Sequence, residues 1–168
     1  MALHPLILQI QEQVPGLVLN VWYLDDCTLC GSAEDLLKAL DIIESAVPSY
    51  GLSLNRSKCL FYSPDDSFIP HPDIPTTHDG FSLLGVPIGS PESCNQYVLR
   101  KADQAMDIVP LLSSLHDTQM SITLLRSCWS FSKMSYLLRS TLSPYISEAL
   151  STFDDKVQEA FFSLLVFS

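Results

Sequence analysis

From a boundary between residues 90 and 96 onward, the hydrophobic pattern of this chain becomes helical and stays helical. Before that point, short apolar segments of strand-like composition alternate with helical ones, and after it apolar residues recur at helical spacing. We therefore expect an α+β part over residues 1–90 and an all-α part over residues 91–168. Hydrophobic residues make up 47% of the 168 residues and charged residues 17%, a balance that favours a packed core over disorder.

The N-terminal part contains a predicted β-hairpin with two acidic residues at its turn. Leu3–Gln13 has the spacing of a short helix, which Pro15-Gly16 ends. Leu17–Tyr23 is typical of a strand rich in Val, Leu and aromatic residues. Asp25-Asp26 interrupts the apolar pattern, which resumes at Thr28–Cys30. The simplest geometry is an antiparallel hairpin with the two aspartates at or beside its turn.

A capped helix follows the hairpin. Ser32 is a favourable N-cap residue, and Asp35 stands where it can help to close a capping box. Apolar residues then follow at helical spacing as far as Val47. Pro48 stops the helix, and Gly51 suits the chain reversal after it.

The rest of the N-terminal part is predicted to be strands and loop. Leu52–Asn55 alternates like a strand, and Cys59–Tyr62 continues it. Pro64–Gly80 carries four prolines and four aspartates and is expected to be an unusually long loop. Phe81–Ile88 is a short apolar segment around a glycine.

Three apolar stripes predict the helices of the C-terminal part. Pro110 must end or kink the first of them, and Ser143-Pro144 supplies an N-cap followed by proline at the first helical position of the third. The stripes consist of Leu99, Ala102, Met106 and Val109; of Ile122, Leu125, Trp129 and Leu137; and of Tyr145, Ala149, Phe153, Val157, Ala160 and Leu164.

The two adjacent carboxylates of Asp25 and Asp26 are the residues most suited to chemistry. Two neighbouring negative charges beside apolar strand residues are costly unless something offsets their repulsion. Mg²⁺ does this with oxygen ligands, and two such ions about 3.5–4 Å apart can promote phosphoryl or nucleotidyl transfer. The alternative is an ordinary solvated Asp-Asp turn.

Several segments in the same order resemble reverse transcriptases of non-LTR retrotransposons. Tyr23-Leu24-Asp25-Asp26 resembles their Y-x-D-D box, and Gly51–Cys59 resembles the G-L-x-x-N-x-x-K segment that follows it. Leu83–Gly89 is similar to the L-G segment often called the primer grip. Ala2–Leu6 resembles the end of the helix behind the G-D-P-L box, and Leu124–Arg126 and Tyr136–Arg139 are similar to thumb segments.

This resemblance implies the C-terminal part of a polymerase palm at 1–90, with the hairpin packed on helices, and a truncated thumb-like segment at 91–168. The family's activity is RNA-directed DNA polymerisation with two Mg²⁺ ions. By resemblance, Asp25 would ligate metal, Asp26 would support or share it, and Lys58 would approach the phosphates of the nucleotide.

The resemblance also implies binding roles. Tyr23 would lie near the primer or the incoming nucleotide, and Leu84 and Gly85 would position the primer end. The partners would be an RNA template and a DNA primer.

Other parts of the family's catalytic site are not in this sequence. The fingers, the first catalytic aspartate and the G-D-P-L box would precede the segments that match. We therefore expect weak or absent Mg²⁺ binding and no polymerisation by the chain alone, unless a missing polymerase half or a protein partner completes it. The alternatives are a non-catalytic binding or scaffold remnant and a non-functional retrotransposon relic.

Charge and hydropathy constrain partners and location. The formal net charge of −10 argues against nucleic-acid binding by the chain alone, because affinity for a polyanion comes largely from Lys and Arg. Six of the nine Lys and Arg residues lie from residue 100 onward, so any contact with a nucleic-acid backbone is expected there. Without a signal-peptide pattern or an apolar run long enough for a bilayer, we expect an intracellular protein and no membrane partner.

Two further patterns favour structural interpretations. Cys27 and Cys30 have zinc-like spacing, but no second close pair follows, so reduced and buried thiols are expected. Trp129, Phe131 and Tyr136 stand at roughly helical spacing, which favours core packing, with base stacking as the alternative.

Overall fold

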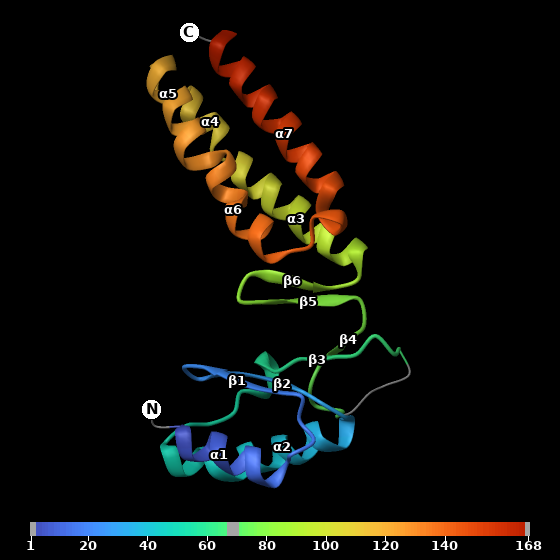
Figure 1. Cartoon of the computed structure of the whole chain (residues 1–168). Helices are drawn as coiled ribbons and strands as arrows, with labels where there is room; N and C mark the ends of the chain where they lie inside the picture. The colour runs from blue at the N-terminus through green and yellow to red at the C-terminus, as the bar shows by residue number, and fades with distance from the viewer. Residues whose placement is uncertain (1–2, 67–70, 167–168) are drawn as a thin grey trace. The chain divides into compact units, whose positions relative to one another are not determined.

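The computed structural model describes residues 3–66 and 71–166, and it forms two compact units, Met1–Thr76 and Thr77–Ser168 (Figure 1). Together they are an α+β protein, as expected. The division into a palm-like segment at 1–90 and a thumb-like segment at 91–168 stays a prediction from the resemblance. In the fold, the hairpin around Gly85 belongs to the second unit.

The first unit contains the predicted hairpin between two helices in the sequence. Helix α1 spans His4–Gln13, strands β1 and β2 span Leu19–Tyr23 and Asp26–Cys30, and helix α2 spans Ala33–Ala46 (Figure 1). The strands pair antiparallel, with Leu19 opposite Cys30 and Tyr23 opposite Asp26. The predicted helix and hairpin are both confirmed.

The cap of α2 forms as its sequence predicts. The Ser32 hydroxyl oxygen accepts a hydrogen bond from the Asp35 backbone N–H at 3.2 Å, and the same hydroxyl donates to the Asp35 carboxylate at 2.7 Å. This cap fixes the chain direction directly after β2 and so ties the hairpin to the helix.

The hairpin packs one of its faces on the two helices. Trp22 and Leu29 contact a core in which the buried residues come from α1 and from the α2 region: Leu6, Ile10, Val14, Ala39, Ile43 and Val47. The Trp22 indole N–H donates to the Asn20 side-chain oxygen at 2.8 Å. Burial of several complete aliphatic side chains contributes about 1.5–3 kcal/mol each. Because this core packs on the inner face of the hairpin, it fixes the position of the turn between β1 and β2.

The segment after α2 differs from its prediction. A 3₁₀ turn at Val47–Tyr50 (η1) leads to Gly51, whose φ of 72° makes the reversal that only glycine adopts without strain. Leu52–Asn55 is not a strand, so that prediction is wrong. Instead, a 3₁₀ turn forms at Arg56–Lys58 (η2) because the Asn55 side chain accepts a hydrogen bond from the Ser57 N–H at 3.1 Å.

Arg56 fastens this segment to α2. Its Nε and Nη2 donate to the two carboxylate oxygens of Glu44 at 2.7 and 2.8 Å, and its Nη1 donates to Asp73 at 2.9 Å. The two hydrogen bonds from Arg56 to Glu44 hold the pKa of the Glu44 carboxyl below its ordinary value. Because the guanidinium is committed to two carboxylates, Arg56 is not a free cation for phosphate binding.

Little strand structure accompanies the predicted long loop. The short strands β3 (Phe61–Tyr62) and β4 (Thr76–Thr77) pair with each other, and the first unit ends within β4. The part of the loop at 67–70 lies outside the described residues.

The second unit is a hairpin followed by helices. Its strands β5 and β6 span Gly80–Leu83 and Val86–Gly89. The helices are α3 (Pro91–Met106), α4 (Val109–Ser113), α5 (Thr118–Leu124), the π-helical turn η3 (Leu125–Trp129), α6 (Phe131–Ser140) and α7 (Ser143–Val166). Helix α7 packs along α3, as Figure 1 shows. Among the described residues, no helix has the length and apolarity to cross a membrane.

The core of this unit confirms the third predicted stripe and shifts the first. Ala149, Phe153, Ala160 and Leu164 of α7 are buried, with Ile146 in place of the expected Tyr145. In α3, Ala102 is buried as predicted, but its buried neighbours are Cys94, Val98 and Ala105, while Leu99 and Met106 are only partly buried. The buried face of α3 is therefore centred one residue earlier than the apolar pattern indicated.

The second predicted helix is broken rather than continuous. The chain widens into the π-helical turn η3 and leaves helical geometry at Ser130, where φ is −93° and ψ is −121°. A π turn adds one residue to the helical turn, so side chains after it point in a different direction from the stripe before it. Leu125 and Leu137 are buried, but Trp129 is only partly so.

Candidate functional site

The turn between β1 and β2 presents the two predicted catalytic aspartates to solvent. Because Tyr23 pairs with Asp26, only Leu24 and Asp25 lie between the strands. Leu24 has a φ of 59°, a conformation that costs a non-glycine residue about 1 kcal/mol or more, and its side chain is 73% exposed. Asp25 and Asp26 are both exposed. A rigid hairpin thus carries a strained turn with two adjacent carboxylates at its tip.

Neither carboxylate is engaged within the protein. Among the described residues, neither Asp25 nor Asp26 makes an ion pair or a side-chain hydrogen bond. In the same part of the chain, no three His, Cys, Asp or Glu side chains come together in a way that could hold a metal ion. The turn therefore offers two free carboxylates as a partial set of oxygen ligands.

Lys58 lies in the same compact unit, at the end of η2, and its side chain is exposed. It makes no ion pair with Asp25 or Asp26. The structure brings the two aspartates and Tyr23 together at the turn but does not join Lys58 to them.

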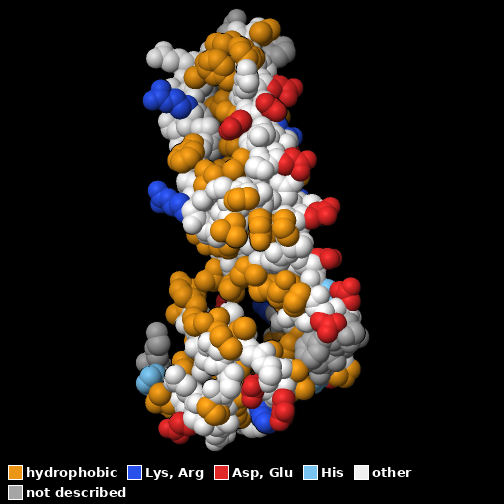
Figure 2. All heavy atoms as spheres, turned by 45° about the vertical axis from the view of Figure 1, so that its right-hand side comes forward, with side chains coloured by type: hydrophobic (Ala, Val, Ile, Leu, Met, Phe, Trp, Pro, Cys, Tyr) orange, Lys and Arg blue, Asp and Glu red, His pale blue; other side chains and the backbone are white. Residues whose placement is uncertain are grey.

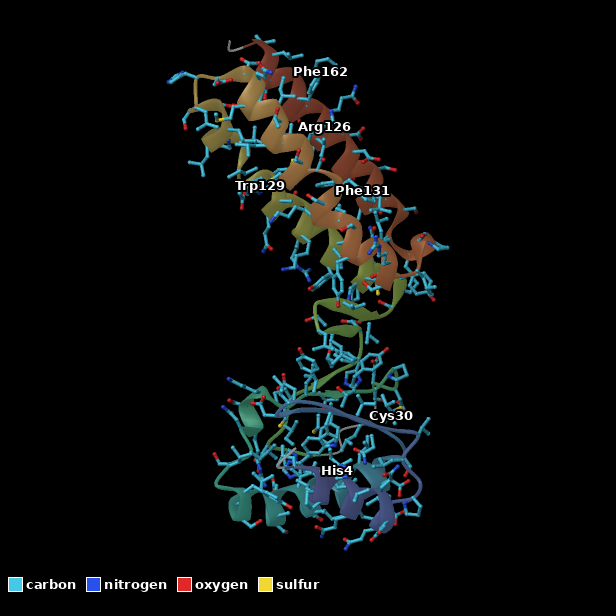
Figure 3. All side chains as sticks on the ribbon, turned by 60° about the vertical axis from the view of Figure 1, so that its left-hand side comes forward. His4, Cys30, Arg126, Trp129, Phe131 and Phe162 are labelled. Carbon is cyan, nitrogen blue, oxygen red and sulfur yellow. The ribbon has the colours of Figure 1, made fainter. Side chains whose placement is uncertain are left out.

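The cysteines of the hairpin are not the buried thiols that the sequence suggested. Cys27 and Cys30 are both exposed (Figure 3 labels Cys30). Desolvation of the Cys27 sulfur, assisted by electrostatic repulsion from its neighbours Cys59 and Asp26, raises the pKa of the Cys27 thiol to about 11. Among the described residues, Cys27 and Cys30 do not join a third His, Cys, Asp or Glu side chain in a group that could hold a zinc ion.

The face of the hairpin turned away from α1 and α2 is apolar and exposed. Leu19, Val21 and Tyr23 alternate with the inward residues of β1, and all three are exposed. In a strand, alternate residues share a face, so these side chains form one continuous apolar row that ends at the acidic turn. Such a row is typical of a surface that another element or molecule covers.

The second predicted region, at Leu84 and Gly85, is the turn between β5 and β6. Both residues have positive φ, 51° and 81°, and Leu84 is exposed. The Tyr136 hydroxyl donates to the Leu84 carbonyl at 2.8 Å, and the Tyr97 hydroxyl donates to the Gly85 carbonyl at 3.2 Å. The turn is therefore held from α3 and α6 by two tyrosines that sequence reasoning did not place beside it.

A groove of about 330 Å³ lies beside this turn, within the second unit. Gly85 lines one end, and the remaining walls come from α3, η3 and α6: Tyr97, Lys101, Gln104, Ala105, Trp129, Lys133, Tyr136 and Leu137. The expectation that the aromatic residues here pack in the core is wrong for two of them, since Phe131 is 67% and Tyr136 52% exposed. Trp129 and Phe131 are labelled in Figure 3.

Two aromatic–lysine pairs in the sequence could have indicated the residues of this groove, but the apolar stripes alone did not. Tyr97 with Lys101 and Trp129 with Lys133 are both aromatic–lysine pairs four residues apart. At that spacing, side chains on a helix are neighbours.

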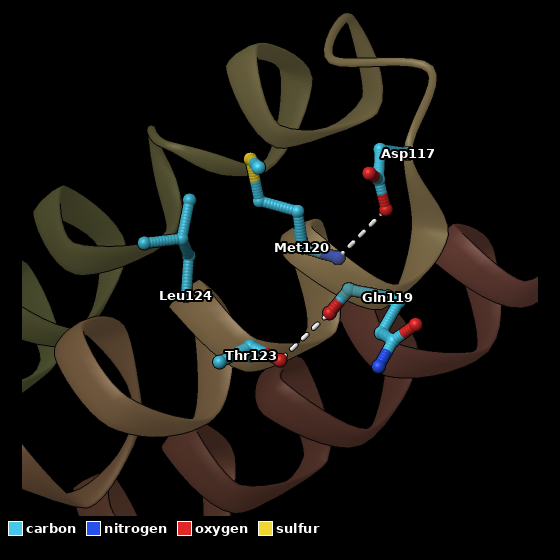
Figure 4. A pocket seen from close by; sticks show the side chains of 5 residues that line it. All are labelled: Asp117, Gln119, Met120, Thr123 and Leu124. Atoms are coloured by element: carbon cyan, nitrogen blue, oxygen red, sulfur yellow. Dashed lines mark hydrogen bonds between the residues drawn. The ribbon is translucent and has the colours of Figure 1, made fainter.

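A second hollow lies on α5, and two of its polar side chains are occupied by hydrogen bonds to the helix backbone. It measures about 300 Å³ and is lined by Asp117, Gln119, Met120, Thr123 and Leu124 (Figure 4). The Asp117 carboxylate accepts a hydrogen bond from the Met120 N–H at 2.9 Å, and the Thr123 hydroxyl donates to the Gln119 carbonyl at 2.7 Å. The Asp117 carboxylate thus caps the start of α5, and the Thr123 hydroxyl is taken up by the helix backbone.

No protein-family model, no curated protein and no solved structure matches this chain.

Proposed function

We propose that this chain is a palm and thumb fragment of a reverse transcriptase of the non-LTR retrotransposon type, and that it takes part in RNA-directed DNA polymerisation only when another chain completes its catalytic site. The observation that carries the proposal is the hairpin turn at Asp25 and Asp26. Its two carboxylates are adjacent and exposed, and among the described residues they make no ion pair. They lie at the tip of a hairpin whose inner face packs on a helical core.

The two carboxylates at the turn are the type of ligand that Mg²⁺ prefers, but they are too few to complete its coordination. Mg²⁺ prefers oxygen ligands in octahedral geometry and is often bound by one or two carboxylates together with water and substrate phosphates. Asp25 and Asp26 would hold it from one side. A bound pair of ions would supply activation of an attacking hydroxyl and stabilisation of leaving pyrophosphate. Tyr23 would border the primer or nucleotide, Lys58 would meet its phosphates, and an RNA template and DNA primer would be the substrates.

Metal binding at the turn can be measured directly on the intact chain. Mn²⁺, a paramagnetic substitute for Mg²⁺, is titrated while the backbone NMR signals are followed. We expect selective broadening at the β1–β2 turn with millimolar affinity, as suits a site with few protein ligands. The broadening should disappear in Asp25→Asn/Asp26→Asn. It should persist in Asp154→Asn/Asp155→Asn, which removes the same charge from another adjacent aspartate pair, on α7. Equal broadening in both variants would contradict the proposed site.

Catalysis is tested by primer extension. The folded chain is given a poly-rA template, an oligo-dT primer, dTTP and Mg²⁺, with Asp25→Asn in parallel. We expect no extension by these residues alone, because Asp25 and Asp26 supply only part of the carboxylate set that two-metal catalysis requires. Extension that disappears in Asp25→Asn would mean that the chain completes the site by itself and that the dependence on another chain is wrong.

A second candidate function, a binding or scaffold module, is favoured by the apolar row of Leu19, Val21 and Tyr23. Under that hypothesis the row would dock a protein partner, and the carboxylates would have no role. Val21→Ser would then abolish partner binding, whereas Asp25→Asn would leave it unchanged. Loss of partner binding in Asp25→Asn would argue against a purely structural role of the hairpin.

A further inference from the structure

The groove of the second unit combines two lysines with aromatic rings. The Lys133 ammonium lies 5.1 Å from the centre of the Trp129 ring, and the Lys101 ammonium lies 5.7 Å from the centre of the Tyr97 ring. Both lysine side chains are exposed, and so is the Tyr136 side chain, which lines the same groove. The groove thus offers positive charge and open aromatic rings on one concave surface.

The two lysines of the groove are not neutralised within the protein. In the described ranges, neither Lys101 nor Lys133 is held in an ion pair. The recorded polar partner of Lys101 is the neutral side chain of Gln104, at 3.3 Å. Of the described residues that line the groove, none is acidic. Both ammonium groups can therefore pair with carboxylates of another molecule.

The outward side of helix α7 carries side chains complementary to those of the groove. Four of them, which we call the acidic row, stand at positions i, i+7, i+11 and i+14 of the helix: Glu148, Asp155, Glu159 and Phe162. At that spacing they follow one line along the helix, on the side away from the buried Phe153. All four are exposed. The row combines negative charge with an open aromatic ring.

The carboxylates in the middle of the acidic row have no partner within the protein. Among the described residues, neither Asp155 nor Glu159 makes an ion pair or a side-chain hydrogen bond. The neighbouring Lys156 pairs with Asp103 instead, at 2.9 Å. Asp155 and Glu159 are one helical turn apart, so their side chains project to the same side. Because the groove is walled by α3, η3, α6 and the β5–β6 turn, the α7 row of the same chain does not line it.

The charges of the second unit are segregated between its elements. Residues 77–168 carry six Lys and Arg against nine Asp and Glu, which gives −3, while residues 1–76 carry three against ten, which gives −7. Four of the nine acidic residues lie on α7, whereas five of the six basic ones lie on α3, η3 and α6. Figure 2 shows that on one face of the second unit the acidic side chains follow one edge, and the prominent basic ones lie along the opposite edge. This segregation favours contact between unlike edges of two molecules.

We infer that the groove of one copy of this chain receives the acidic row of a second copy, with Asp155 and Glu159 beside Lys101 and Lys133 and with Phe162 against an aromatic ring of the groove. The contact is heterologous, because each copy contributes its groove to one neighbour and its acidic row to another. Association can therefore continue beyond a pair. The inference goes beyond the proposed function, since neither carboxylate of the β1–β2 turn takes part in the contact.

The net charge of −10 opposes this association mainly at long range. At about 0.1 M salt, charges more than about 10 Å apart are largely screened, whereas carboxylates and ammonium groups in contact are screened much less. An unrelated acidic protein would also use the two lysines. The second copy is the better fit because the chain itself carries two unpaired carboxylates and an open ring in one row.

Sedimentation equilibrium of the intact chain at about 0.1 M salt tests the contact. The average mass should rise with protein concentration. Lys101→Glu/Lys133→Glu and Asp155→Lys/Glu159→Lys should each weaken self-association about tenfold or more, because like charges then face each other. An equimolar mixture of these two variants should associate again, since the reversed groove attracts the reversed row and the two intact surfaces still match.

Two further variants match these changes in net charge. Arg126→Glu/Arg139→Glu reverses two exposed cations that do not line the groove, and Glu12→Lys/Asp41→Lys reverses two exposed carboxylates of the first unit. Both should associate like the unmodified chain, and circular dichroism confirms that each variant is folded. A loss as large as in the groove and row variants would show that total charge is the cause and would overturn the inference.

The aromatic part of the contact has its own readout. In a Trp22→Phe background, Trp129 is the sole tryptophan, and its emission should change as the protein concentration rises. Phe162→Ala should weaken self-association about threefold or more, because it removes the ring at the end of the row. Leu142→Ala removes another exposed apolar side chain, just before α7, and should leave the association unchanged. Equal effects of these two variants would contradict the docking of Phe162.

The remaining outcomes separate the inference from its rivals. Asp25→Asn/Asp26→Asn should associate like the unmodified chain, so a failure of the metal site leaves this contact standing. A chain that stays monomeric at every concentration, or a variant mixture that does not associate, would overturn the inference. Binding of poly-glutamate or oligo-dT by such a monomer, lost in Lys101→Glu/Lys133→Glu, would assign the groove to another acidic ligand.

Discussion

Replacement of Phe153 tests whether the second unit has a cooperative core. This side chain projects from α7, is 4% exposed and packs in the cluster that contains Val98, Ala102 and Met134. Phe153→Leu keeps an apolar side chain but loses volume, and we expect it to lower the free energy of unfolding by about 1 kcal/mol. Phe153→Ala leaves a larger cavity, and a loss of about 3–5 kcal/mol is expected. That is a large fraction of the stability of a small domain.

The two tryptophans allow each unit to be followed separately. Trp22 lies in the first unit and Trp129 in the second, and the chain has no others. In a Trp22→Phe background, thermal unfolding is monitored by Trp129 fluorescence and by circular dichroism. Phe153→Leu should lower the midpoint by about 4–8 °C for each kcal/mol lost. In a Trp129→Phe background, the midpoint reported by Trp22 should stay unchanged, because the described residues of the core around Trp22 all belong to the first unit.

Phe162 on the same helix provides the matched control. Its side chain is 54% exposed, so Phe162→Leu should change the stability by no more than about 0.5 kcal/mol. If Phe153→Leu and Phe162→Leu had the same small effect, the burial argument would be wrong. A broad, non-cooperative transition in the unmodified chain would instead favour a relic that does not pack.

Three further changes probe the contacts around the candidate sites. Tyr136→Phe removes the hydrogen bond to the Leu84 carbonyl, and urea unfolding should show a loss of about 0.5–1.5 kcal/mol; no loss would mean that water replaces the bond. Leu84→Asn should instead stabilise by up to about 1 kcal/mol in the same assay, because Asn tolerates positive φ better than Leu, and a destabilisation would contradict the strain. The lowered pKa of Glu44, set by Arg56, contributes stability above the unfolded pKa of about 4.3 that is lost as pH falls through the folded pKa. The fall in melting temperature below pH ~4.5 should therefore be shallower in Glu44→Gln, and an unchanged profile would exclude this pair as its cause.

Local sequence signals predicted the first unit well where the structure depends on neighbours in the chain. The Ser32 cap, the hairpin with Asp25 at its turn and the reversal at Gly51 all follow from side chains within a few residues. The strand expected at Leu52–Asn55 failed because its alternation is overruled by the Asn55 cap and by the tertiary bonds of the next residue. Alternation of apolar residues carries no information about such partners.

The groove was missed for a different physical reason. One extra residue in a helical turn rotates everything after it by roughly 100°, since successive helical residues are that far apart around the axis. An uninterrupted helix from Ile122 would extend a single apolar stripe through Trp129. The π-helical turn breaks this phase, so Trp129, Lys133 and Tyr136 line the groove, and Leu137 lies at its base as part of the buried core. Apolar spacing alone cannot show where a helix takes up an extra residue.

The β1–β2 turn and the groove require opposite electrostatic surroundings, and they lie in separate units. Carboxylates at a hairpin tip gain metal affinity when the surroundings are acidic, because like charges raise the attraction for a divalent cation. The nucleic-acid contact that the proposed function requires needs the reverse, unpaired cations away from carboxylates. The unit with Asp25 and Asp26 carries −7, and the unit with Lys101 and Lys133 carries −3. A net charge of −10 for the whole chain is thus compatible with nucleic-acid binding, provided that the binding is confined to the second unit.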